Sequence, residues 1–319
     1  MNEDFNNSEN SHEEEKPSHR EIYPTMSPIA AAFTGLAVVF VLYQIGGSLL
    51  TLFIFGFDIE SANMNAMRLM TIGGQIMFIL LPALVFAKLI YEDVGTIIRF
   101  KLPNWKEVFV FAGGLALLTP LLQSFLYLQT YMLNQLAEHI YLVQKVKEVL
   151  DALDKLVTET YAELLKSTSV FEASFIIIVV AVIPAVCEET FFRGFVQKSF
   201  EFRIKPIWAA AVTAVFFALY HFNPYGLLAL FALGFFFGYS AYKSNSIFIP
   251  LILHFLNNLI AIISYFVLGD EEIMQADVSD PSQIGFNVFL FIFFLILFIS
   301  YIILVNKQYN KIESRKEML

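Results

Sequence analysis

Cysteine and charge are scarce in this sequence. The single cysteine, Cys187, excludes an intrachain disulfide, and neither CxxC nor zinc-ribbon spacing is present. Charged residues make up 15% of the 319 residues, against roughly 25% in soluble globular domains. Residues 1–24 lack the basic, apolar and small-residue regions of a secretory signal peptide. These absences exclude a small disulfide-stabilised secreted domain and a zinc-ribbon protein.

Apolar residues are abundant instead. They make up 57% of the chain, with a mean hydropathy of +0.65 and 35 phenylalanines. A membrane-spanning helix needs about 20 apolar residues, and such runs lie near 29–56, 66–90, 107–128, 172–192, 206–222, 226–242, 246–268 and 284–305. We therefore predict an all-α polytopic membrane protein with about eight transmembrane helices around an intramembrane polar cavity.

The remaining segments give the expected domain organisation. Residues 1–24 form an acidic tail that has too little apolar surface to fold. Residues 25–306 form the helical membrane domain, followed by a basic tail over 307–319. Within the domain, about 133–168 has apolar residues at helical spacing opposite Lys and Glu, which predicts an amphipathic extramembrane helix. No internal repeat or second soluble domain is visible.

Lysine and arginine predict the sidedness of the membrane domain, because cytoplasmic loops are enriched in both. The basic residues that cluster after the second and fourth spans and in the C-terminal tail are Lys88, Arg99, Lys101, Lys106, Lys198, Arg203, Lys205, Lys307, Lys311, Arg315 and Lys316. The loop 269–283 has none. We expect both termini to be cytoplasmic and the protein to lie in a bacterial inner membrane.

Ionisable residues inside the predicted spans are few and clustered. Each costs about 2.5–3.5 kcal/mol in hydrocarbon on insertion scales, so they mark functional sites. They occur in spans four, five and seven and are Glu188, Glu189, Arg193, His221 and His254.

Helical spacing separates the two glutamates. Glu189 and Arg193 are four residues apart, the separation at which an ion pair forms, so a structural role is expected for both. Glu188 lies about 100° around the helix and shares Arg193 less easily. It is a candidate general base or, alternatively, a second structural carboxylate.

The histidines have defined neighbours. Phe217 and His221 share a helical face, so the aromatic ring packs under the imidazole and limits its rotamers. His254 and Asn258 share another face, and Asn257 is expected to point elsewhere. A lone histidine on an apolar helix is usually a packing residue, but two histidines with a carboxylate and an amide favour catalysis.

This set of side chains suits hydrolysis by water. Glu188 and His221 can hold and deprotonate a water molecule, while His254 and Asn258 can donate hydrogen bonds to an oxyanion. No Gly-x-Ser-x-Gly element is present, and the buried Cys187 thiol is expected to be inert. Glu188, His221 and His254 are also a possible zinc ligand set, although no HExxH helix is present, and spacing alone leaves that alternative open.

The motifs resemble those of the CPBP intramembrane proteases, also called the CAAX protease and bacteriocin-processing or Abi family, which includes the type II CAAX prenyl endopeptidases. The family pattern is EExxxR, FxxxH and HxxxN on successive helices. It occurs here in order at 188–193, 217–221 and 254–258, within an expected catalytic core of about 170–265. The resemblance implies a glutamate-dependent, metal-independent endopeptidase without a cofactor.

The resemblance also implies roles for individual residues. Glu188 and His221 would activate the water, and His254 and Asn258 would stabilise the oxyanion. The supporting residues would be Glu189, Arg193 and Phe217. The expected partners are the lipid bilayer and a peptide or protein substrate, membrane-associated or not, with no nucleic acid. The alternatives are a non-catalytic binding or immunity factor of the same fold, a zinc-dependent variant of the protease and an ion-coupled transporter, which lacks the expected inverted repeat.

Counting residues from the apolar ends predicts the depth of the site. Glu188 and His254 fall in the cytoplasmic half of the bilayer, which predicts that water and substrate enter from the cytoplasm or the inner leaflet. His221 falls nearer the opposite face. Either its helix begins in the cytoplasm or tilts, or Pro184 and Pro206 break the neighbouring helices.

Overall fold

The computed structural model describes residues 22–56, 63–268 and 281–317, and these residues form helices and loops without a β-strand. Most of the acidic tail and the acidic loop, at 1–21 and 269–280, lie outside the described residues. Seven described helices are long and apolar enough to cross a membrane, and an eighth apolar helix is shorter. The predicted all-α membrane fold with about eight spans is confirmed.

The first two spans form a helical pair. The first comprises α1 (Pro28–Phe40), a π-helical segment (Val41–Gly46) and α2 (Gly47–Phe55). The second comprises α3 (Met64–Gln75), a π-helical segment (Ile76–Leu80) and α4 (Leu81–Tyr91), followed by the short α5 (Val94–Ile98). The Asn63 side chain accepts hydrogen bonds from two backbone amides and fixes the start of α3.

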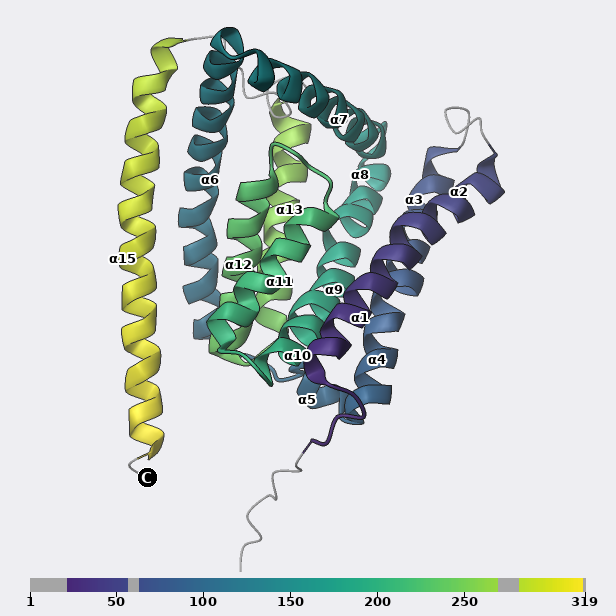
Figure 1. Cartoon of the computed structure of the whole chain (residues 1–319), viewed down its shortest axis with the longest axis vertical. Helices are drawn as coiled ribbons and strands as arrows, with labels where there is room; N and C mark the ends of the chain where they lie inside the picture. The colour runs from purple at the N-terminus through teal and green to yellow at the C-terminus, as the bar shows by residue number, and fades with distance from the viewer. Residues whose placement is uncertain (1–21, 57–62, 269–280, 318–319) are drawn as a thin grey trace, which may run out of the picture.

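Two long helices follow. The third span, α6 (Trp105–His139), begins at a capping box of Asn104 and Glu107 and leads into α7 (Tyr141–Leu165). Figure 1 shows α7 lying across one end of the helical bundle. The amphipathic helix predicted near 133–168 therefore corresponds to the end of α6 and to α7.

The fourth span is one long rod with two local changes of helical type. It comprises α8 (Val170–Ile177), π-helical Ile178–Val182, α9 (Ile183–Glu189), π-helical Thr190–Val196 and α10 (Gln197–Glu201). Single-turn π segments inside α-helices are frequent at functional sites. The rod is longer than the predicted span, which ended near 192.

Four further helices complete the bundle: α11 (Pro206–Tyr220), α12 (Leu227–Ser244), α13 (Phe248–Leu268) and α15 (Ile284–Glu317). In Figure 1, α15 runs alongside α6, and the described parts of both termini reach the end of the bundle opposite α7. We call this opposite end, with the α10–α11 and α12–α13 connections, the basic end, because it carries the basic residues named above.

The extent of the fourth span explains the depth of His221. From Glu188 the rod rises about 20 Å to Glu201, and α11 rises about 22 Å from Pro206 to His221, at about 1.5 Å per residue. The two antiparallel helices thus bring both side chains to one level. The apparent mismatch in depth arose because the fourth span was expected to end too early, and neither proline breaks its helix.

Candidate active site

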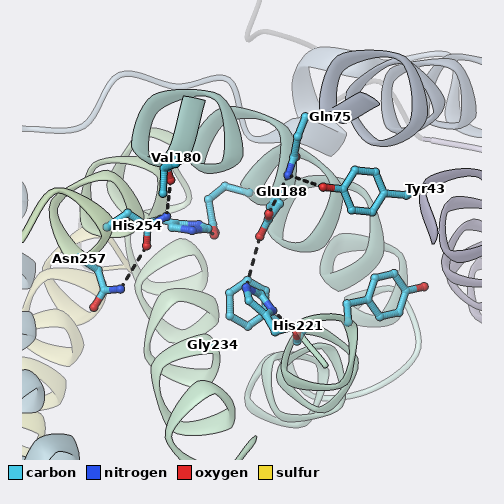
Figure 2. Close-up of polar contacts among 12 residues, drawn as sticks. Tyr43, Gln75, Val180, Glu188, His221, Gly234, His254 and Asn257 are labelled. Atoms are coloured by element: carbon cyan, nitrogen blue, oxygen red, sulfur yellow. Dashed lines mark hydrogen bonds and ion pairs between the residues drawn. The ribbon is translucent and has the colours of Figure 1, made fainter. Parts of the chain in front are cut away.

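Glu188 and His221 face each other in the bundle interior. Glu188 lies in α9, and His221 is the residue that ends α11. The Nε2 atom of His221 is 3.8 Å from Oε2 of Glu188, as Figure 2 shows. Oε2 of Glu188 is buried and makes no hydrogen bond to another described residue. The predicted pair of carboxylate and imidazole is therefore brought together in the structure.

The tautomer of His221 follows from its second contact. Its Nδ1 atom is 2.7 Å from the Phe217 carbonyl oxygen, which can only accept a hydrogen bond. Nδ1 therefore carries the hydrogen, and Nε2 presents a lone pair toward the Glu188 carboxylate. Two acceptors 3.8 Å apart form a suitable site for a water molecule that donates one hydrogen to each.

Gln75 and Tyr43 complete the surroundings of Glu188. Nε2 of Gln75, in α3, donates to Oε1 of Glu188 at 3.3 Å and to the Tyr43 hydroxyl at 3.2 Å. Both residues come from the first two spans, and Gln75 is only 4% exposed. Neither residue was predicted from the sequence, because the prediction rested on charged residues and histidines in the fourth, fifth and seventh spans. A glutamine within the long apolar run of the second span was the available signal.

Glu189 joins Arg193 and His254 in a buried network. Oε1 of Glu189 accepts from Nη1 of Arg193 at 2.8 Å and contacts Nδ1 of His254 at 2.7 Å. The side chains of Glu189 and Arg193 are fully buried. The ion pair expected from the four-residue spacing is present. Its contact with His254 adds an orienting role for Glu189, because a carboxylate at Nδ1 fixes the ring so that Nε2 is the remaining nitrogen.

Arg193 is enclosed by aromatic rings and backbone. Its Nη2 atom donates to the Gly234 carbonyl at 3.0 Å, and its guanidinium carbon lies 4.2 Å from the centre of the Phe217 ring. A Cβ atom at position 234 would lie 2.7 Å from that ring, so glycine permits the close approach of α12. Phe217 also lies 4.5 Å from the His221 ring and 6.0 Å from the His254 ring. Phe217 thus packs against the rings of both histidines.

The two asparagines of α13 are adjacent in the site. Nδ2 of Asn258 donates to the Val180 carbonyl at 3.0 Å, and Nδ2 of Asn257 donates to Oδ1 of Asn258 at 3.3 Å. The expectation that Asn257 points elsewhere was wrong, because both asparagines line the same cavity. The cavity is wide enough for both Asn257 and Asn258 to line it, although adjacent residues point about 100° apart on a helix. These contacts fix the Asn258 amide and leave its second N–H as a donor.

A cavity of about 560 Å³ contains these groups. Its lining includes Glu188, His221, His254, Asn257 and Asn258. The α7 helix covers one end of it through residues between 157 and 165. A cavity of this size is within the range of small-molecule and peptide sites.

Two contacts join α7 to other segments of the bundle, one through buried Arg68 and one between Tyr225 and the exposed Asp151. The Arg68 guanidinium, which is 1% exposed, donates to the Leu164 carbonyl at 3.1 Å. The Asp151 carboxylate accepts from Lys147 at 2.7 Å and from the Tyr225 hydroxyl. Burial raises the pKa of Asp151, but these two hydrogen bonds outweigh it and hold the pKa below its ordinary value. Arg68 was not among the ionisable residues singled out in the sequence.

A metal site would need several His, Cys, Asp or Glu side chains around one point. Among the residues that the structure describes, no group of three or more His, Cys, Asp and Glu side chains is arranged to hold a metal ion. The third member of the possible zinc set, His254, contacts Glu189 through Nδ1, which leaves only its Nε2 atom for another ligand. Cys187 is fully buried and free.

The fold and the site define a class of protein. This is an integral membrane protein whose polar side chains meet in a buried cavity, with a carboxylate and an imidazole placed around room for a water molecule. Residues 170–260 match the family model of the type II CAAX prenyl endopeptidase Rce1-like proteins. This part of the chain is therefore an Rce1-like domain of the CAAX-protease type, as its motifs predicted. No curated protein and no solved structure matches the chain.

The matched range contains every residue of the three motifs, from Glu188 to Asn258. Membership of this domain family indicates a peptidase of the CAAX-protease type that works in a membrane.

Proposed function

We propose that the protein is a metal-independent intramembrane endopeptidase that hydrolyses a peptide bond with water activated by Glu188 and His221. The facing of Oε2 of Glu188 and Nε2 of His221 across 3.8 Å is the observation that supports this most. A water molecule between them donates one hydrogen to each. Glu188 takes a proton as the water oxygen attacks the carbonyl carbon of the substrate.

The opposite side of the cavity suits the oxyanion that forms next. The second N–H of Asn258 and a proton on Nε2 of His254 are donors to this oxygen. A proton on Nε2 makes His254 a cation. Together with the carboxylates of Glu188 and Glu189 and the Arg193 guanidinium, the charges of these four groups then sum to zero. Collapse of the intermediate breaks the carbon–nitrogen bond, and the proton held by Glu188 goes to the leaving amine.

Glu189 and Arg193 act indirectly in this proposal. Glu189 keeps the His254 ring in one orientation, and Arg193 holds the Glu189 carboxylate in place through the contact at 2.8 Å. Gln75 donates to Oε1 of Glu188 and leaves Oε2 for the water. These three residues are positioning residues, since none of them contacts the reacting atoms.

We place the protein in a bacterial inner membrane with both termini in the cytoplasm. The support is the concentration of Lys and Arg at the basic end of the bundle, where the described parts of both termini lie. A peptide or protein segment that reaches the cavity from the membrane or its surface is the proposed substrate.

Metal removal separates this mechanism from the zinc-dependent alternative. We expect exhaustive chelation to leave the rate of peptide cleavage unchanged within twofold, because no step needs a Lewis acid. The measurement is cleavage by the purified protein before and after chelation, with metal content per chain determined in parallel. One zinc per chain, with activity lost on removal and regained on restoration, would favour the zinc-dependent protease.

A further inference from the structure

The active-site cavity extends from the catalytic cluster mainly toward α7, and Phe192 lines it on the opposite side. On the fourth span its lining includes Val179 and Pro184, which precede Glu188 on the way to α7. On α13 it includes Ala261 and Tyr265, which follow His254 and lead toward the same end. Figure 1 shows α8 and α7 together at this end, with α10 at the other.

The other direction is closed by packed side chains. Beyond Glu188 toward α10, the described residues Phe192, Arg193 and Gln197 are at most 2% exposed. Nε2 of Gln197 donates to the Gly238 carbonyl at 3.0 Å and so joins the rod to α12 at this level. Phe237 stacks on the His254 ring at 5.6 Å from the same side. A route from the basic end to the catalytic groups would have to break these contacts.

The two ends of the bundle differ in how far acidic residues balance their basic residues. The lysines near the cavity end lie in or next to α7, and all four pair with acids of the same helix, as Lys145–Glu148, Lys147–Asp151, Lys155–Glu159 and Lys166–Glu163. The basic end carries an excess of basic side chains. They are Lys88, Lys101, Lys106, Lys198, Arg203, Lys205, Lys243 and the C-terminal lysines. The excess of basic residues predicts that the basic end faces the cytoplasm.

The exposed apolar side chains of α7 suit a position at the membrane interface on the side opposite the basic end. Leu142, Val149 and Leu156 are 72%, 60% and 64% exposed, and Val146 and Leu153 continue the same helical stripe. A helix with an exposed apolar stripe and a charged face lies in the interfacial plane of a bilayer. Residues between 157 and 165 of the same helix, including Thr160, line the cavity.

We infer that the catalytic cavity opens to the non-cytoplasmic side of the membrane, beneath α7, and that the enzyme cleaves peptide segments of exported or membrane-anchored proteins presented at the outer leaflet. This deepens the proposed function and rests on it. It reverses the expectation of cytoplasmic entry, which assumed that Glu188 lies close to the cytoplasmic end of its helix. The long α10 extension separates Glu188 from that end.

Cysteine labelling tests the side of entry. In a Cys187→Ser background, Thr71→Cys places a thiol in the cavity lining, and Arg203→Cys is the matched reporter at the exposed basic end. A membrane-impermeant maleimide applied to the outside of intact cells should label Thr71→Cys at least tenfold faster than Arg203→Cys. Inside-out vesicles should give the reverse order, and Ile263→Cys, on an exposed apolar part of α13, should stay unlabelled from either side.

Labelling needs no turnover, so its result is independent of whether the peptidase mechanism is right. Labelling of Thr71→Cys together with Arg203→Cys from inside-out vesicles only would overturn the inference and leave the peptidase proposal intact. The same variants also allow the effect of labelling on peptide cleavage to be measured. Impermeant maleimide outside the cell should block cleavage by Thr71→Cys and spare Arg203→Cys, whereas equal sensitivity of both variants would also contradict outward opening.

Discussion

Replacing Glu188 by glutamine is expected to lower the rate of peptide-bond hydrolysis by about 10²–10⁴-fold, the contribution of a positioned general base. Glutamine has nearly the same shape and keeps the contact with Gln75, but it cannot accept the proton of the water. The measurement is cleavage of a membrane peptide by the purified protein in proteoliposomes. His221→Ala should have a similar effect, because the water then loses one of its two acceptors.

Two controls make this result specific. Glu159→Gln changes an exposed carboxylate of α7 and should leave the rate within twofold of wild type. The thermal unfolding temperature of Glu188→Gln in detergent should equal or exceed that of wild type, since the change removes a half-buried charge. Near-normal turnover by Glu188→Gln would show that the base has been assigned to the wrong residue.

Replacing Arg193 by methionine is expected to cost about 3–5 kcal/mol of folding free energy, because the fully buried Glu189 carboxylate loses its arginine partner and keeps only its contact with His254. The large effect follows from complete burial of both side chains. Thermal and denaturant unfolding in detergent measure it. Exposed Lys155→Met, which breaks the 3.7 Å pair with Glu159, should cost at most about 1 kcal/mol.

The double variant Glu189→Gln/Arg193→Met separates ion pairing from packing. If the cost of the single change comes from a buried charge that has lost its arginine partner, the double variant should be more stable than the sum of the two single losses predicts. Strict additivity of the two losses would contradict the account of this pair as a coupled unit. An Arg193→Met protein as stable as wild type would contradict the destabilisation itself.

The helical membrane fold could be predicted because apolar composition is a local property of the chain. The end of the fourth span could not be predicted in the same way. The motif from Glu188 to Arg193 interrupts the apolar run, which made 192 look like its end. In the structure the helix continues to Glu201, because Arg193 and Gln197 find buried partners on α12. Such partners are tertiary contacts, and no sequence window contains them.

In the candidate site, too, contacts set by local spacing could be predicted and long-range contacts could not. Glu189 and Arg193 could be paired from sequence because four-residue spacing determines their proximity. The contacts of Glu189 with His254 and of Glu188 with Gln75 join residues 65 and 113 positions apart, so only the packed structure reveals them. The side of entry that we infer differs from the one expected from the sequence for a related reason. It depends on where α7 lies and where α10 ends, and neither can be read from local hydropathy.

The central claim is that Glu188 activates water to hydrolyse peptide bonds in or at the membrane. Quantitative mass spectrometry of membrane peptides from cells that carry wild-type protein, Glu188→Gln or Glu159→Gln tests it most directly. We expect a defined set of peptides with new carboxyl termini in the wild-type and Glu159→Gln membranes, each at least a hundredfold less abundant with Glu188→Gln. Production in heavy-oxygen water should place one labelled oxygen in each new carboxylate. Identical peptide populations in all three membranes would contradict the account.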